Sequence, residues 1–108
     1  MNAPDPGLRV DVWLWRARLF KTRSLATRSV TGGHVRLTSG GTTRRLSRAS
    51  ALVRTGDTLT LPVNARIVRL EILGIGTRRG PASEAQALYR LLDDATEDSP
   101  SRTLTPEL

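Results

Sequence analysis

Apolar residues near the start of the chain recur with the spacing of a helix. The positions i, i+3, i+4, i+7 and i+10 are Val10, Trp13, Leu14, Ala17 and Phe20. Residues with this spacing lie on one side of a helix, so the pattern predicts a first helix that starts near residue 9 and buries one face. Two prolines and a glycine precede it, and we interpret residues 1–8 as a flexible lead-in.

A second short helix is predicted directly after "FKTR". Thr22 or Ser24 can cap its first turn, because a hydroxyl accepts a hydrogen bond from a free N–H group there. Gly32 and Gly33 then provide the left-handed stop that often ends a helix. The residues expected to be buried are Leu25, Ala26 and Val30. The two helices are expected to form a compact pair.

The apolar spacing falls to two in the next part of the chain. "HVRL" predicts a short strand, and "TSGGTT" after it is typical of a turn. The segments "DTLTLPV" and "IVRLEIL" both alternate apolar with polar residues, and "PVNAR" joins them as a hairpin loop. The pattern favours an α+β fold, in which two N-terminal helices pack on a small, mostly antiparallel sheet.

A third helix is predicted over about residues 82–93. Ser83 with Gln86 three positions later matches a capping box, and the apolar side of the helix is Ala85, Leu88 and Leu92. Beyond it, residues 94–108 are rich in acids and poor in apolar residues, which predicts a disordered acidic tail. The folded domain is therefore expected to span residues 9–92.

The distribution of charge is unusual. Between Asp11 and Asp57 the chain contains nine arginines and one lysine but no acid, whereas about five acids are expected in a window of that length. A surface that faces only water normally mixes both signs, because like charges repel. The missing acids therefore predict a continuous cationic face that meets a polyanion, and nucleic-acid phosphate is the commonest one.

Several classes of function are disfavoured by composition. The chain has no cysteine and one histidine, His34, which argues against thiol catalysis and against a zinc site. Paired carboxylates are missing from the basic window, and no glycine-rich phosphate loop is present. We therefore expect neither an enzyme nor a metal or other cofactor. With no apolar run of 18 residues, no membrane partner is expected, and the predicted location is the cytoplasm.

The type of nucleic acid is less clear from composition. Two helices followed by strands are also compatible with a winged DNA-binding module. However, the second helix offers arginines and hydroxyls rather than the Asn and Gln side chains that read bases in the major groove. Such a surface suits the phosphates and 2′-hydroxyls of structured RNA. RNA is favoured, and the DNA-binding alternative stays open.

The order of these residues resembles the S-four (S4) RNA-binding domain, first described in small-subunit ribosomal protein four. The matching positions are Arg9 and Asp11, Lys21-Thr22-Arg23, Ala26, Gly33-His34-Val35, and Ser50, Val53 and Gly56-Asp57. The segment "RRGPASEAQALY" is in addition similar to the C-terminal signature of the heat shock protein 15 family.

The resemblance implies a non-enzymatic binder of ribosomal RNA. The family is associated with free large ribosomal subunits that carry a stalled nascent chain on tRNA, and with their recycling or rescue. The partners implied are large-subunit ribosomal RNA and, as a further possibility, tRNA, and we expect a monomer. The RNA-facing candidates carried over by position are Arg9, Arg16, Lys21, Thr22, Arg23, Arg28, His34, Arg36, Arg78 and Arg79. A stand-alone remnant of an RNA-modifying enzyme is the other alternative.

Two features depart from the family pattern. The hairpin after Val35 usually turns on Asn-Gly, but this chain has the longer segment 38–49, with three arginines whose role is open: Arg44, Arg45 and Arg48. The tail is acidic here, whereas the family's tail tends to be basic. No contact between tail and RNA is therefore inferred.

Overall fold

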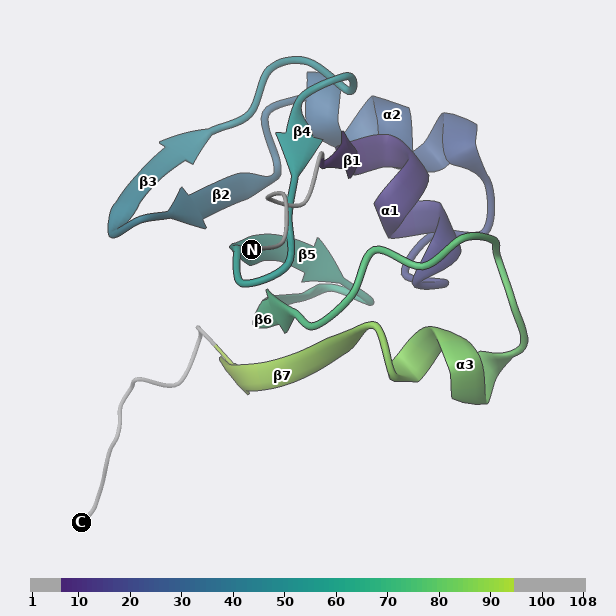
Figure 1. Cartoon of the computed structure of the whole chain (residues 1–108). Coiled ribbons are helices and arrows are strands. Elements are labelled where there is room, and N and C mark those ends of the chain that lie inside the picture. Colours follow the sequence, from purple (N-terminus) through teal and green to yellow (C-terminus); the bar gives the residue numbers. More distant parts are fainter. Residues whose placement is uncertain (1–6, 95–108) are drawn as a thin grey trace, which may run out of the picture.

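The computed structural model describes residues 7–94, and the predictions for the lead-in and the tail lie largely outside these residues. Seven strands and three short helices are arranged as shown in Figure 1. Along the described part of the chain they are β1 (Leu8–Arg9), α1 (Val10–Arg16), α2 (Arg23–Thr31), β2 (Arg36–Ser39), β3 (Thr42–Arg45), β4 (Leu52–Val53), β5 (Thr58–Val63), β6 (Arg66–Ile72), α3 (Ala82–Gln86) and β7 (Tyr89–Asp94).

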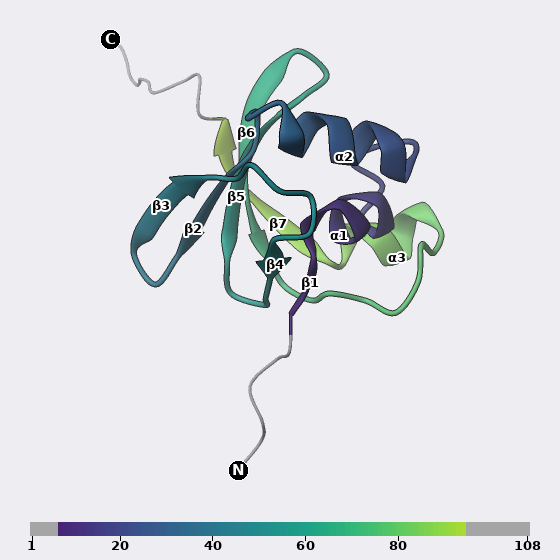
Figure 2. The same cartoon turned by 90° about the horizontal axis from the view of Figure 1, so that it is seen from above.

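The expected antiparallel sheet is confirmed. Five strands pair antiparallel in the order β3-β2-β5-β6-β7, and β1 pairs with β4 in a separate two-stranded ribbon. All three helices lie on one side of the large sheet, which Figure 2 shows most clearly. The β2–β3 hairpin extends away from the helices in both views (Figure 1 and Figure 2). The opposite face of the sheet therefore has no helix over it.

The core lies between the sheet and the first two helices. Alternate residues of β5 and β6 are buried against it, among them Leu59, Leu61 and Leu70, as expected for strands with one covered face. Trp13 of α1 is fully buried, and its indole N–H donates a 2.8 Å hydrogen bond to the carbonyl oxygen of Gly74. Because that N–H has a partner, burial of the large ring costs no unsatisfied polar group.

The ends of α2 follow the predicted signals. The hydroxyl of Thr22 accepts a 3.1 Å hydrogen bond from the amide of Leu25, so Thr22 is the cap. Gly33 follows the helix with φ +81°, a conformation that favours glycine. The first helix is shorter than its apolar spacing suggested: it ends at Arg16, and Arg18 has φ +60°. Phe20 nevertheless packs against the core from the loop.

The predicted helix over residues 82–93 is wrong for most of its length. Helix α3 ends at Gln86, and the chain continues as strand β7, which pairs with β6. The capping box is also absent, since Pro81 precedes the helix without a side-chain cap and Ser83 lies inside it. Pairing with β7 satisfies backbone groups along β6 that a helix cannot reach. In addition, Tyr89 packs edge-to-face on Trp13, with ring centroids 6.4 Å apart.

The segment 38–49 forms a regular hairpin and a connection. Strands β2 and β3 are joined by Gly40 and Gly41 alone, with φ angles of +59° and +84°. Both central residues of such a two-residue turn require positive φ, which glycine adopts without strain. The turn is thus as tight as that of the family pattern.

Candidate nucleic-acid interface

A shallow groove of about 550 Å³ runs along one side of α2. Its walls combine guanidinium groups with hydroxyls, and its lining residues are Arg9, Asp11, Arg23, Ser24, Thr27, Arg28 and Thr31. Ser24, Thr27, Arg28 and Thr31 follow helical spacing, so one face of α2 presents them together. Three of the arginines predicted from the sequence therefore meet at this groove.

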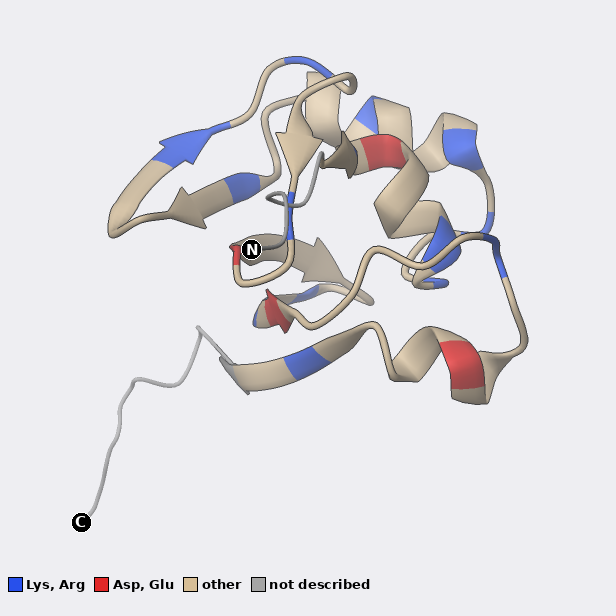
Figure 3. Ribbon diagram, viewed as in Figure 1, with Lys and Arg blue, Asp and Glu red and all other residues tan. Residues whose placement is uncertain are grey.

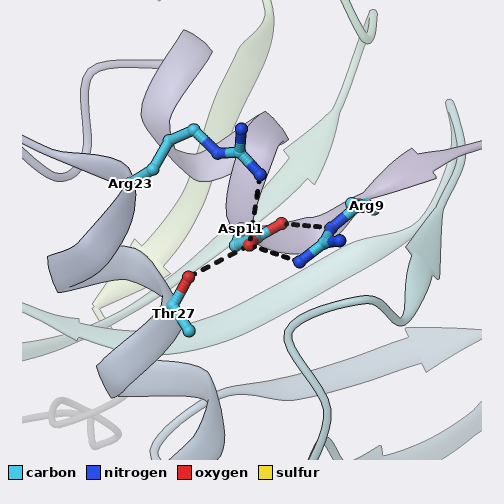
Figure 4. A network of polar contacts seen from close by, with 4 residues as sticks. All are labelled: Arg9, Asp11, Arg23 and Thr27. Carbon is cyan, nitrogen blue, oxygen red and sulfur yellow. Dashed lines mark hydrogen bonds and ion pairs between the residues drawn. The ribbon is translucent and has the colours of Figure 1, made fainter.

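A buried carboxylate organises one end of the groove. Asp11, in the first turn of α1, is 1% exposed. It accepts hydrogen bonds of 3.0 and 2.9 Å from Nε and Nη2 of Arg9 and one of 3.0 Å from the hydroxyl of Thr27. Nη2 of Arg23 lies 3.7 Å from the same carboxylate. Figure 4 shows the three side chains converging on Asp11.

The two arginines keep part of their hydrogen-bonding capacity. The side chains of Arg9 and Arg23 are 49% and 50% exposed, and each guanidinium has five N–H donors. Asp11 uses two donors of Arg9, which holds the guanidinium in place and leaves three N–H groups of this half-exposed side chain for other partners. A fixed guanidinium is well suited to a phosphate oxygen, because it loses less side-chain entropy on binding.

The contacts of Asp11 also set its ionisation. Burial by itself raises the pKa of this carboxyl group, but hydrogen bonds from Arg9 and Thr27 and the positive charge of Arg9 lower it more. The pKa of Asp11 consequently lies below its ordinary value. The carboxylate stays ionised at neutral pH and can hold both arginines.

The groove continues around the end of α2 toward the sheet. A second hollow, of about 340 Å³, is lined by Leu25, Arg28, Ser29, His34 and Pro62. A third, of about 320 Å³, is lined by Gly33, His34, Arg36, Thr60, Leu61 and Ile67. Arg28 belongs to the first two hollows and His34 to the last two. The three hollows thus form a continuous surface, which we call the α2 surface, from Arg9 to Arg36.

Other predicted site residues hold the fold together. Nη1 of Arg16 donates hydrogen bonds of 3.4 and 2.8 Å to the carbonyl oxygens of Ile75 and Gly76. Arg79 donates a 3.1 Å bond to the carbonyl of Trp15 and lies 5.7 Å from the centre of the Trp15 ring. These contacts fix the segment between β6 and α3 on the end of α1, so part of each side chain is occupied.

The remaining predicted site residues are Arg78, Lys21 and Thr22. Arg78 forms a 2.8 Å ion pair with Glu84, while Lys21 is exposed in the loop before α2. The hydroxyl of Thr22 serves as the helix cap. Figure 3 shows cationic positions on α2, β2 and β3 and also between β6 and α3. The expected cationic face therefore divides into the open α2 surface and a second set of arginines engaged in contacts within the protein.

The candidates predicted from the sequence did not include the individual hydroxyl residues of the groove or Arg45, although hydroxyls on the second helix were expected and the role of Arg45 was left open. Ser24, Thr27 and Thr31 share the exposed side of α2 with Arg28, a spacing that the sequence did contain. The side chain of Arg45, in β3, comes close to Gly33, in the connection between α2 and β2: a Cβ atom at position 33 would lie 3.2 Å from the Cδ of Arg45. That approach depends on the register of β2 and β3, which the sequence alone does not give.

Residues 7–94 contain no group of three or more His, Cys, Asp or Glu side chains that could hold a metal ion. Neither is any of their helices long and apolar enough to cross a membrane.

Comparison with known proteins places this chain in a family. Residues 8–37, from β1 to the middle of β2, match the S4 domain model. Over 105 residues the chain is 33% identical to heat shock protein 15 of Escherichia coli K12, an alignment that covers 97% of this chain and 75% of the relative. The chain belongs to the heat shock protein 15 family.

Other members of the heat shock protein 15 family are also similar to this chain. The Haemophilus influenzae homolog is 32% identical over 83 residues, which are 77% of this chain and 60% of the relative. The trimeric structure of Vibrio cholerae heat shock protein 15 superimposes with a TM-score of 0.73 at 37% identity, covering 84% of this chain and 88% of that one. The S4-like fold and the family membership together support RNA binding as the general function.

Proposed function

We propose that this chain binds ribosomal RNA of the large ribosomal subunit through the α2 surface, and that it acts in the recycling or rescue of large subunits that carry a nascent chain on tRNA. The observation that carries the proposal is the groove of arginines and hydroxyls anchored by Asp11. In this proposal the chain is a cytoplasmic binding protein without enzymatic activity of its own.

The chemistry of the groove favours a sugar–phosphate backbone. Guanidinium groups pair with phosphate oxygens through charge-assisted hydrogen bonds. The hydroxyl of Ser24 can donate to phosphate. The O–H groups of Thr27 and Thr31 already donate to Asp11 and to the carbonyl oxygen of Arg28, but their oxygens can accept a hydrogen bond from a 2′-hydroxyl, which duplex DNA lacks. Contacts of this kind read the shape of folded RNA rather than its sequence.

The proposal is tested by RNA affinity as a function of salt. If about five to seven phosphates are contacted, the logarithm of the affinity falls against the logarithm of salt with a slope of roughly −4 to −6. Arg23→Gln removes one guanidinium from the groove and should weaken binding to all structured RNAs and make the slope shallower by about 1. Arg90→Gln is the matched control, because it removes the same charge from β7, where Arg90 pairs with Glu71. Affinity that is insensitive to salt, or equal effects of the two variants, contradicts the proposal.

The large-subunit part of the proposal needs a separate experiment. Purified protein is mixed with bacterial 50S and 30S particles and with 70S ribosomes, and the mixtures are sedimented through sucrose gradients. The protein should travel with free 50S particles, and most strongly with those that carry peptidyl-tRNA. Sedimentation only with 30S particles, or with none, rejects this part and leaves RNA binding itself to the affinity measurement.

The winged-module alternative predicts the opposite preference between nucleic acids. Unlabelled structured RNA should displace bound RNA at lower concentration than duplex DNA does, at the same salt concentration. Stronger competition by DNA favours the alternative.

The expected monomer is also a proposal. The Vibrio cholerae relative is described as trimeric, so the oligomeric state of this chain should be measured by equilibrium sedimentation.

A further inference from the structure

The face of the large sheet that points away from the helices carries a second set of polar side chains. Leu37 and Leu59 lie opposite each other in β2 and β5 and are buried on the helix side. Successive side chains of a strand point to opposite faces. Arg36 and Thr38 of β2, together with Thr60 of β5, therefore lie on the outer face, over which no described helix packs (Figure 2).

Arg45 of β3 joins this face directly opposite Arg36. The two residues are Cα partners in the β2–β3 register. Next to them, the amide of Leu46 donates to the carbonyl of Val35 at 2.9 Å, so those two form a hydrogen-bonded pair. Because the two classes of pair alternate along an antiparallel ladder, Arg36 and Arg45 form a non-hydrogen-bonded pair, in which Cα atoms are only about 4.5 Å apart.

The next pair on the same face is close as well. The hydroxyl oxygens of Thr38 and Thr43 are 2.7 Å apart, as expected when the same alternation is continued by two residues. Two arginines thus lie beside two hydroxyls on one exposed ribbon. Like charges placed directly opposite each other destabilise a strand pair. Within residues 7–94, neither Arg36 nor Arg45 has an ion pair with an acid.

We infer that Arg36 and Arg45 form a second phosphate-binding site, which holds another segment of RNA backbone beside the α2 surface. Two guanidinium groups can share one phosphate, which replaces their mutual repulsion by attraction to the same anion. The hydroxyls of Thr38 and Thr43 share one hydrogen bond, and the O–H group that this bond does not use supplies a further donor. Since Arg36 and His34 line the same hollow, the site continues the α2 surface around the edge of the sheet. This inference rests on the proposed RNA-binding function.

The chain offers a matched pair of variants for a test. Arg44 and Arg45 are adjacent in β3 and both exposed, but Arg44 lies opposite Leu37 and so belongs to the other face of the hairpin. Affinity for a fluorescently labelled ribosomal RNA fragment is measured by anisotropy over a range of salt concentrations. Arg45→Gln should lower the affinity on the order of fivefold and make the salt slope shallower by about 1. Arg44→Gln should change the affinity less than about twofold, although it removes the same charge.

Thermal unfolding separates this effect from damage to the fold. Arg45→Gln removes the cross-strand repulsion, so its melting temperature should equal or exceed that of the parent protein. Equal losses of affinity in Arg44→Gln and Arg45→Gln, or no loss in either, overturn the second site. If Arg23→Gln weakens binding while Arg45→Gln does not, only this inference fails. If the parent protein binds no structured RNA, the proposed function fails together with it.

Discussion

Asp11 provides the sharpest prediction about the groove, because a simple charge argument and the structure predict opposite results. Asp11→Asn removes a negative charge from a surface proposed to bind phosphate. On charge alone, the variant should bind RNA more tightly. The structure predicts weaker binding, because Asp11 fixes the orientation of Arg9 and contacts Arg23.

The two effects can be compared in size. For a phosphate about 7 Å from the carboxylate and an effective dielectric constant of about 40 to 80, Coulomb's law gives a repulsion of roughly 0.6 to 1.2 kcal/mol, which the variant removes. The variant loosens Arg9 and Arg23, and ordering a loosened arginine on binding costs up to about 0.5 to 1.5 kcal/mol, so the two together cost up to about 3 kcal/mol. The net expectation is a loss of about 1 kcal/mol, or roughly fivefold in affinity.

Asp11→Asn should also destabilise the fold. The asparagine keeps the shape but replaces a charge-assisted pair with Arg9 by a neutral contact. Because Arg9 is half exposed, the expected loss is about 1 to 2 kcal/mol, below that for a fully buried pair. The melting temperature should fall by about 5 to 15 °C, and RNA binding is therefore measured well below it.

The pH dependence of the stability tests whether the Asp11 carboxylate is the cause of this loss. The folded state lowers the pKa of Asp11 from its ordinary 3.8, so the ionised group stabilises the fold above that pH. This contribution is lost as the pH falls through the lower pKa of the folded state. In denaturant titrations, the stability difference between parent and Asp11→Asn should be constant from about pH 7 to pH 5 and should shrink below about pH 4. A difference that persists at low pH points to altered packing instead.

Asp57→Asn is the matched control for RNA affinity, because it removes the same charge from a buried site at the β4–β5 turn, where Asp57 accepts a hydrogen bond from the amide of Arg54. It should leave RNA affinity unchanged or slightly raised. The positioning role of Asp11 is refuted if Asp11→Asn binds RNA as tightly as Asp57→Asn does.

Substitutions at three further residues test the structural roles described above. Arg16→Gln should lower the free energy of unfolding by about 1 to 2 kcal/mol in urea titrations, because the hydrogen bonds from Arg16 to the carbonyl oxygens of Ile75 and Gly76 are lost. A loss of RNA affinity larger than that of Arg23→Gln would contradict the structural role of Arg16. Gly33→Ala should cost about 1 to 2 kcal/mol because of its positive φ, and an unchanged melting temperature argues against that conformation. Thr22→Ala should cost about 1 kcal/mol through loss of the helix cap, whereas Thr22→Ser should keep most of the stability.

The sequence was most informative where structure is local. Thr22 and Gly33 bound the second helix as predicted, and the alternation in β5 and β6 gave the sheet. The residues of β7 also have helical spacing, but pairing with β6 decides their conformation. That choice depends on an edge formed by a distant part of the chain, which local propensity does not include.

The same distinction applies to the site. The missing acids pointed to a basic surface, and Arg9, Arg23 and Arg28 do meet in one groove. Arg16 was a candidate by its position in the family resemblance, but its carbonyl partners lie about 60 residues later in the chain, so sequence spacing gave no sign of its structural role. The position of Arg45 opposite Arg36 depends on the register of β2 and β3, which the sequence alone does not give.

The central claim, that RNA lies along the α2 surface, is tested most directly by mapping contacts on the intact protein. The protein bound to a large-subunit ribosomal RNA fragment is irradiated with ultraviolet light, and the cross-linked peptides are identified by mass spectrometry. The account predicts cross-links within residues 22–36, on α2 and the start of β2. Cross-links confined to residues 75–90, or equally frequent over the whole surface, contradict it.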